Sequence, residues 1–143
     1  MKALFSVLAI GLLVAADRRP GNENRDEGKP SGTWTFVKHD VDGKPTPDDE
    51  LKAMTITFEA DKFVIKKGDE VMEAGTQKMD PSKKPAEVDV TITEGERKGQ
   101  TQLGIYEMTG DTLKYCFAME GKVRPKEFKS GSGLISGELR KKK

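Results

Sequence analysis

Residues 54–59 read Met-Thr-Ile-Thr-Phe-Glu, and residues 88–93 read Val-Asp-Val-Thr-Ile-Thr. In both stretches apolar and polar side chains alternate with a period of two. A β-strand turns successive side chains to opposite faces, so this period predicts strands with one buried and one solvated face. Such strands are typical of antiparallel sheets, and they indicate an all-β fold.

Six further segments of the chain are rich in β-branched and aromatic residues and predict strands at 33–39, 62–67, 71–79, 101–108, 112–118 and 134–140. Turn-forming residues separate many of these segments, among them Asp42-Gly43, Glu94-Gly95 and Thr109-Gly110-Asp111. Eight short strands joined mostly by tight turns predict an up-and-down barrel or a sandwich.

One short helix is expected after the first strand, over residues 46–53. Thr46 is suited to the N-cap, and Pro47 is suited to the first helical position. The acidic residues 48–50 follow in the first turn, where the helix dipole favours negative charge. The dipole explains this cluster better than a pair of catalytic carboxylates does.

Residues 1–16 have the features of a secretory signal peptide. Lys2 supplies a positive charge, residues 3–16 carry no charge, and the run ends in the small residues Ala15 and Ala16. The alternative is a membrane anchor, but about 14 apolar residues fall short of the roughly 20 needed to span a bilayer. We therefore expect export to the periplasm or the extracellular space, with no stable membrane anchor after processing.

The sequence divides further into a disordered leader at 17–30, a folded domain at 31–140 and a basic tail at 141–143. The leader contains two prolines and no apolar side chain to bury. The whole chain has 25 basic and 24 acidic residues, and removal of the signal peptide takes away only Lys2. A net charge near zero argues against binding to nucleic acid.

No catalytic or metal-binding constellation stands out in the sequence. His39 is the single histidine, which excludes a multi-histidine metal site. We interpret it as a polar residue near the end of the first strand. Cys116 is the single cysteine and is expected to be a buried structural thiol. Residues 40–49 faintly resemble a calcium loop, but a turn at Asp42-Gly43 explains them more simply. The sequence therefore predicts no enzyme, cofactor or metal.

Phrases spread over residues 32–140 resemble a family of small secreted lipocalin-like domains that is abundant in planctomycete bacteria. The matching phrases are Gly32-Thr33-Trp34, Val41-Asp42-Gly43-Lys44-Pro45, Gly75-Thr76 with Asp80-Pro81, Gly104-Ile105-Tyr106, Gly110-Asp111-Thr112-Leu113-Lys114-Tyr115-Cys116-Phe117 and Arg124-Pro125-Lys126-Glu127-Phe128. The resemblance implies an eight-stranded antiparallel lipocalin-like barrel, and it implies no reaction.

The phrase Gly32-Thr33-Trp34 also looks like the Gly-x-Trp that opens the first strand of lipocalins. There the tryptophan closes one end of the barrel, and an arginine of the last strand lies across it. This likeness implies a barrel-closing pair of Trp34 and Arg140.

The predicted interior leaves little room, because most inward-facing candidates are medium to large and an eight-stranded barrel is small. These candidates are Met54, Ile56, Phe58, Phe63, Ile65, Val88, Val90, Ile92 and either Tyr106 or Ile105. We expect a narrow pocket at the end opposite Trp34, near Tyr106, Tyr115 and Arg124, that binds a small, mostly apolar ligand. Arg124 would meet a polar or acidic group on that ligand. The alternative is a structural or protein-interaction domain with a side-chain-filled barrel; no particular protein partner is predicted.

Overall fold

The computed structural model describes residues 28–142, and within that range it contains one short helix and nine strands. The predicted signal peptide, most of the predicted leader and the last residue of the basic tail lie outside the described residues. The elements in chain order are β2 (Gly32–Val41), β3 (Lys44–Pro45), α3 (Asp48–Ala53), β4 (Met54–Glu59), β5 (Lys62–Lys67), β6 (Glu70–Asp80), β7 (Ala86–Glu94), β8 (Thr101–Thr109), β9 (Thr112–Ala118) and β10 (Leu134–Lys141).

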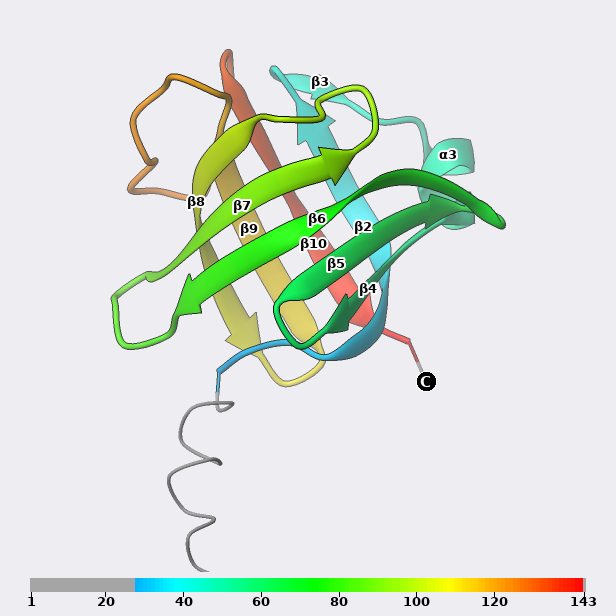
Figure 1. The fold of residues 1–143 in the computed structure, drawn as a ribbon, viewed down its shortest axis with the longest axis horizontal. Helices are drawn as coiled ribbons and strands as arrows, with labels where there is room; N and C mark the ends of the chain where they lie inside the picture. The colour runs from blue at the N-terminus through cyan, green and yellow to red at the C-terminus, as the bar shows by residue number, and fades with distance from the viewer. Residues whose placement is uncertain (1–27, 143) are drawn as a thin grey trace, which may run out of the picture.

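The strands form one antiparallel sheet that closes on itself (Figure 1). From β4 to β10 each strand pairs with the next along the chain, β2 pairs with β4, and β10 returns to pair with β2. The short β3 adds only two residue pairs at one end of β2. Within the described residues, β2 and β4 to β10 therefore make a closed eight-stranded barrel, which confirms the predicted fold and rules out a sandwich.

Alternation along the strands sends one set of side chains into the barrel, as the sequence predicted. The core cluster includes the residues of both alternating stretches, with Met54, Ile56 and Phe58 from β4 facing Val88, Val90 and Ile92 from β7. Tyr106 belongs to this inner cluster, whereas its neighbour Ile105 is buried on the outside of the barrel wall. Of the two residues that the sequence left as alternatives, Tyr106 is therefore the one that points into the barrel.

The outer burial of Ile105 comes from residues 119–133, which cover the outside of β8 and β9. Cys116 and Ala118 share this position, and both are almost fully buried. The Cys116 thiol donates to the Lys129 carbonyl oxygen at 3.4 Å, which confirms the expected buried thiol. The covering segment therefore gives the domain a small second apolar cluster outside the barrel.

Trp34 marks the closed end of the barrel, where it is 1 % exposed and packs edge-to-face against Phe58 at 6.5 Å. The segment before β2 runs across this end (Figure 1). Its Ser31 carbonyl accepts a hydrogen bond from the Trp34 indole, and its Gly28 carbonyl accepts one from Tyr106. Residues 28–30, which were assigned to the leader, thus pack on the barrel, with Pro30 buried.

The helix α3 lies at the opposite, open end and buries Leu51. Its N-cap is Pro47 rather than the predicted Thr46, so the helix begins one residue later than expected. The Asp42-Gly43 turn that precedes it is confirmed: both residues have a positive φ, as a tight hairpin turn requires. The Asp42 carboxylate accepts a hydrogen bond from the Gly133 amide, which ties this turn to the start of β10.

Candidate functional site

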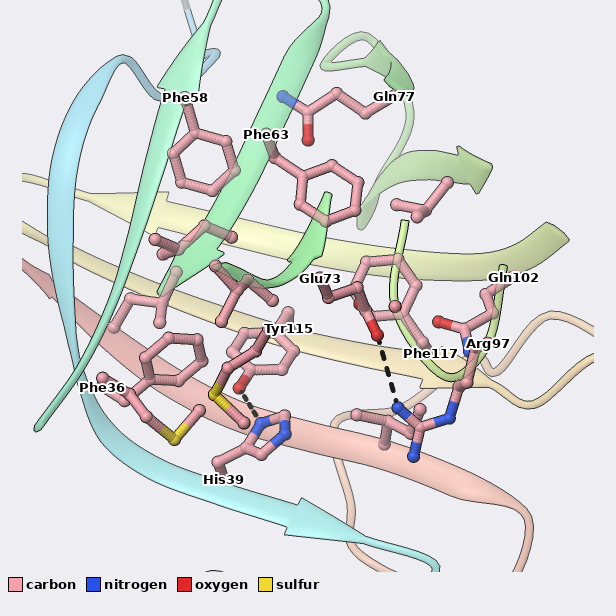
Figure 2. Close-up of a pocket in the computed structure, with 18 of the residues that line it drawn as sticks. Phe36, His39, Phe58, Phe63, Glu73, Gln77, Arg97, Gln102, Tyr115 and Phe117 are labelled. Carbon is pink, nitrogen blue, oxygen red and sulfur yellow. Dashed lines mark hydrogen bonds and ion pairs between the residues drawn. The ribbon is translucent and has the colours of Figure 1, made fainter. Parts of the chain in front are cut away.

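A cavity of about 590 Å³ occupies the barrel and reaches the end opposite Trp34 (Figure 2). Its walls are mainly aromatic and aliphatic, and its mouth lies between the start of β6 and the turn from β7 to β8. This volume lies within the range of about 300–1,000 Å³ that small-molecule sites occupy. The cavity opens at the predicted end of the barrel, and its lining includes Tyr106 and Tyr115.

Three glycines explain why an interior with many large residues still has room. Gly75, Gly104 and Gly137 stand directly opposite Phe63, Phe117 and Tyr115 on the neighbouring strands. A β-carbon at Gly75 would lie 3.0 Å from the Phe63 ring, and one at Gly104 would lie 2.7 Å from the Cε1 atom of Phe117. The rings therefore lie against glycine backbone on the barrel wall, and the centre of the barrel stays open.

His39 and Tyr115 form a hydrogen-bonded pair in the cavity wall, with 2.6 Å between Nδ1 and the phenolic oxygen. The pKa of His39 is lowered to about 4, chiefly by burial and also by the Arg97 charge, while the Asp40 charge opposes the shift. Burial also raises the pKa of Tyr115 well above its usual value. Both groups are therefore neutral at neutral pH, which suits a largely apolar cavity.

His39 lies near the end of β2, as predicted from the sequence, but its position in the cavity wall was not predicted. The missing information is a β-bulge: Lys38 pairs with Glu138, whereas the next partner pair is Phe36 with Leu139. If side chains alternated strictly from Trp34 onward, Lys38 would point into the barrel. Val37 is an extra residue in β2, so the alternation shifts by one position and His39 points inward instead.

Arg97 and Glu73 meet at the mouth of the cavity, where Arg97 Nη1 lies 3.5 Å from Glu73 Oε1. Burial raises the pKa of Glu73, while the charge and hydrogen bond of Arg97 oppose that shift. Neither residue was predicted from the sequence. Glu73 alternates along β6 with Gly75 and Gln77, so its inward direction could have been inferred from that period, but Arg97 lies in a turn, where no alternation indicates its direction.

Tyr106 and Tyr115 line the cavity, so the structure brings these two predicted site residues together, paired across β8 and β9. The Tyr106 hydroxyl donates to the Gly28 carbonyl oxygen at 2.9 Å. Its pKa is raised to about 12, chiefly by burial and also by the Asp80 charge. Tyr106 therefore offers the cavity its ring, while its hydroxyl is engaged at the closed end.

Arg124, the third predicted ligand contact, does not line the cavity. Its guanidinium lies on the outside of the barrel, where it donates to the Val88 and Gly104 carbonyl oxygens and to the Asp89 carboxylate. A further ion pair links it to Glu87 at 3.8 Å. Arg124 thus anchors the covering segment 119–133 to β7 and β8, and its assignment to the ligand is corrected.

The predicted pairing of Arg140 with Trp34 is also corrected. Trp34 is buried inside the barrel, but Arg140 is exposed and stands opposite Thr35, on the outer face. The inward residue of this part of β10 is Leu139, which is 2 % exposed. The cation–π contact found within residues 28–142 is a different one, between Lys114 and Phe128.

The described residues offer no group of three or more His, Cys, Asp or Glu side chains placed to hold a metal ion. Within residues 28–142 no helix is long and apolar enough to cross a bilayer. Comparison with protein-family models, with curated proteins and with solved structures finds no match to the chain. The resemblance to secreted lipocalin-like domains therefore stays a prediction.

Proposed function

We propose that the protein is an exported binding module that holds a small, mostly apolar ligand inside its barrel. The observation that carries the proposal is the cavity of about 590 Å³ with its predominantly apolar lining. An eight-stranded barrel either fills its interior with side chains or encloses one small ligand. An unfilled interior gives up packing contacts that would otherwise stabilise the domain, and a bound ligand restores them.

The distribution of polar groups supports one orientation of such a ligand. Phe58 and Phe63 line the inner part of the cavity, toward Trp34, and offer only apolar surface. The charged pair of Arg97 and Glu73 lies at the mouth. An apolar body would therefore lie deep in the barrel, with its polar end toward the mouth.

The rim of the cavity supports the entry of an apolar molecule. Val71 and Met72 line the mouth at the start of β6, and they are 45 % and 40 % exposed. Exposed apolar side chains next to an apolar cavity give a hydrophobic molecule a favourable first contact. The cavity supports the binding function over the alternative, a structural or interaction domain with a side-chain-filled barrel.

Ligand binding is tested with the mature protein and a panel of environment-sensitive hydrophobic dyes and medium-chain apolar compounds. Replacing the inward Ile65 with Trp should block the cavity and abolish binding, whereas Val37→Trp places the same ring on the outer face and should leave it intact. Arg124→Ala should also leave affinity unchanged, because Arg124 does not line the cavity. Failure of the wild-type protein to bind any of them more tightly than about millimolar would refute the proposal.

Export is tested independently by the intact mass of the protein recovered from its host. The uncharged run at residues 3–16 leads us to expect cleavage after Ala16, so the recovered mass should lack residues 1–16. Recovery of the full-length chain in the membrane fraction would contradict export by cleavage.

A further inference from the structure

The His39–Tyr115 pair carries information about what the cavity recognises, because its protons can be placed. Tyr115 is 7 % exposed, and its hydroxyl lies 2.6 Å from His39 Nδ1. Among residues 28–142, His39 Nδ1 is the one hydrogen-bond partner of the Tyr115 hydroxyl. A buried hydroxyl whose proton has no acceptor costs free energy, so the Tyr115 O–H must donate to Nδ1.

This assignment fixes the tautomer of His39. A neutral imidazole has one protonated and one unprotonated nitrogen. Because Nδ1 accepts the Tyr115 proton, the ring proton resides on Nε2. The reverse arrangement, with Nδ1–H donating to Tyr115, would leave the phenolic proton without an acceptor in an apolar wall.

The Nε2–H group is free to meet a ligand. No partner for Nε2 occurs in the described part of the chain, where the hydrogen bonds of His39 are limited to the one with Tyr115. Within residues 28–142, the side-chain polar atoms that are both fully buried and without a hydrogen-bond partner are Asp40 Oδ1 and Gln102 Nε2. His39 Nε2 has no partner and is not among them, so it is accessible. His39 itself lines the cavity, and Figure 2 shows its ring facing the space between the walls.

The charged residues around the cavity disfavour an anionic ligand. Two cations, Lys67 and Arg97, and three carboxylates, Glu70, Glu73 and Glu96, line it near the mouth. Arg97 already pairs with Glu73 at 3.5 Å, and Lys67 lies 3.9 Å from Glu50 outside the cavity. No surplus of positive charge therefore remains to offset the dehydration of a ligand carboxylate.

We infer that His39 Nε2–H is the donor that selects ligands carrying an uncharged hydrogen-bond acceptor, such as a carbonyl or ether oxygen, at the polar end. This inference deepens the proposed function and rests on it. The apolar body of the ligand lies against Phe58 and Phe63, and the acceptor oxygen replaces the water that would otherwise meet Nε2. The donor makes the site selective among apolar molecules that fill the cavity equally well.

The test uses three compounds of equal chain length: an alkane, a methyl ketone and a carboxylate. Wild-type protein should bind the ketone roughly 3- to 10-fold more tightly than the alkane, the effect of one net hydrogen bond, and more tightly than the carboxylate. His39→Asn keeps a side-chain acceptor at the Nδ1 position for Tyr115 but has no group at the Nε2 position. In this variant the ketone should lose its advantage over the alkane.

A second measurement on the wild-type protein keeps the inference open to refutation if His39→Asn does not fold. His39 is the single histidine, so the imidazole signals in a nitrogen-15 NMR spectrum belong to it alone. They should show a protonated Nε2 and an unprotonated Nδ1, and the ketone should shift the Nε2–H signal.

A protonated Nδ1, equal affinity for ketone and alkane, or tightest binding of the carboxylate would overturn the inference and leave the proposed function standing. Absence of binding by all three compounds and by the dyes would overturn both.

Discussion

Replacing Gly104 with alanine tests why the barrel has an open interior. Phe117 stands opposite Gly104 on β9, and its ring covers the glycine. A β-carbon at this position would lie 2.7 Å from Cε1 and 2.8 Å from Cγ of that ring. Carbon atoms in contact are normally about 3.5–4.0 Å apart, so the ring must move inward by roughly an ångström.

Two effects of opposite sign compete in this variant. Alanine in a strand removes chain entropy from the unfolded state and by itself would stabilise the fold by about 0.5–1 kcal/mol. Overpacking typically costs about 1–3 kcal/mol, and here the clash involves three atoms of one ring. We expect the overpacking to win, with a net loss of about 1–2 kcal/mol and weaker dye binding because the displaced ring occupies cavity space.

Urea unfolding gives the free energy, and dye titration gives the affinity. Gly131→Ala is the matched control, since its φ is not positive and its β-carbon would lie 3.7 Å from the Leu134 side chain, an ordinary contact. Phe117→Leu combined with Gly104→Ala should recover most of the loss attributable to the clash. If Gly104→Ala is as stable as wild type or more stable, the ring does not lie on the glycine and the explanation of the cavity is wrong.

Three further outcomes follow from the geometry. Trp34→Ala should cost about 3–5 kcal/mol of stability in denaturant unfolding because a fully buried ring is lost, while Arg140→Ala should stay within about 0.5 kcal/mol; a comparable loss from Arg140→Ala would contradict its outward position. Cys116 is 0 % exposed and should resist a thiol reagent until the protein is denatured; rapid labelling of the native protein would show that residues 119–133 do not cover it. The unfolding free energy of wild type relative to His39→Asn should fall as the pH drops from 6.5 to about 4, because the unfolded chain takes up a proton that the buried imidazole refuses. Both proteins contain Glu73, whose raised pKa acts in the opposite direction, so the difference isolates His39; a constant difference across this range would refute the lowered pKa.

The sequence by itself determined the strands, their antiparallel arrangement and most of the inward-facing set. These features depend on local properties: a period of two, β-branched residues and glycine-containing turns between strands. The inner positions of Met54, Ile56 and Phe58 follow from alternation alone, because one face of each strand had to be buried. The predicted burial of Trp34 and Cys116 is also confirmed: Trp34 is buried inside the barrel, and Cys116 is buried beneath residues 119–133.

The tertiary structure decided everything that depends on residues far apart in the chain. The bulge at Val37 turns His39 inward, and its position depends on the register between the first and last barrel strands. Arg124 bonds to carbonyl oxygens of two strands that lie 20 and 36 residues away, so its place outside the barrel cannot be inferred from its own loop.

The cavity volume is the clearest case of such a long-range property. Counting large inward residues predicted a nearly filled interior, and that count omitted the cross-strand partners. Gly75, Gly104 and Gly137 each stand opposite an aromatic ring and let that ring lie on the wall. The size of each side chain follows from the sequence. The direction in which an aromatic ring points depends on the residue opposite it on the neighbouring strand, and the register of the sheet determines which residue that is.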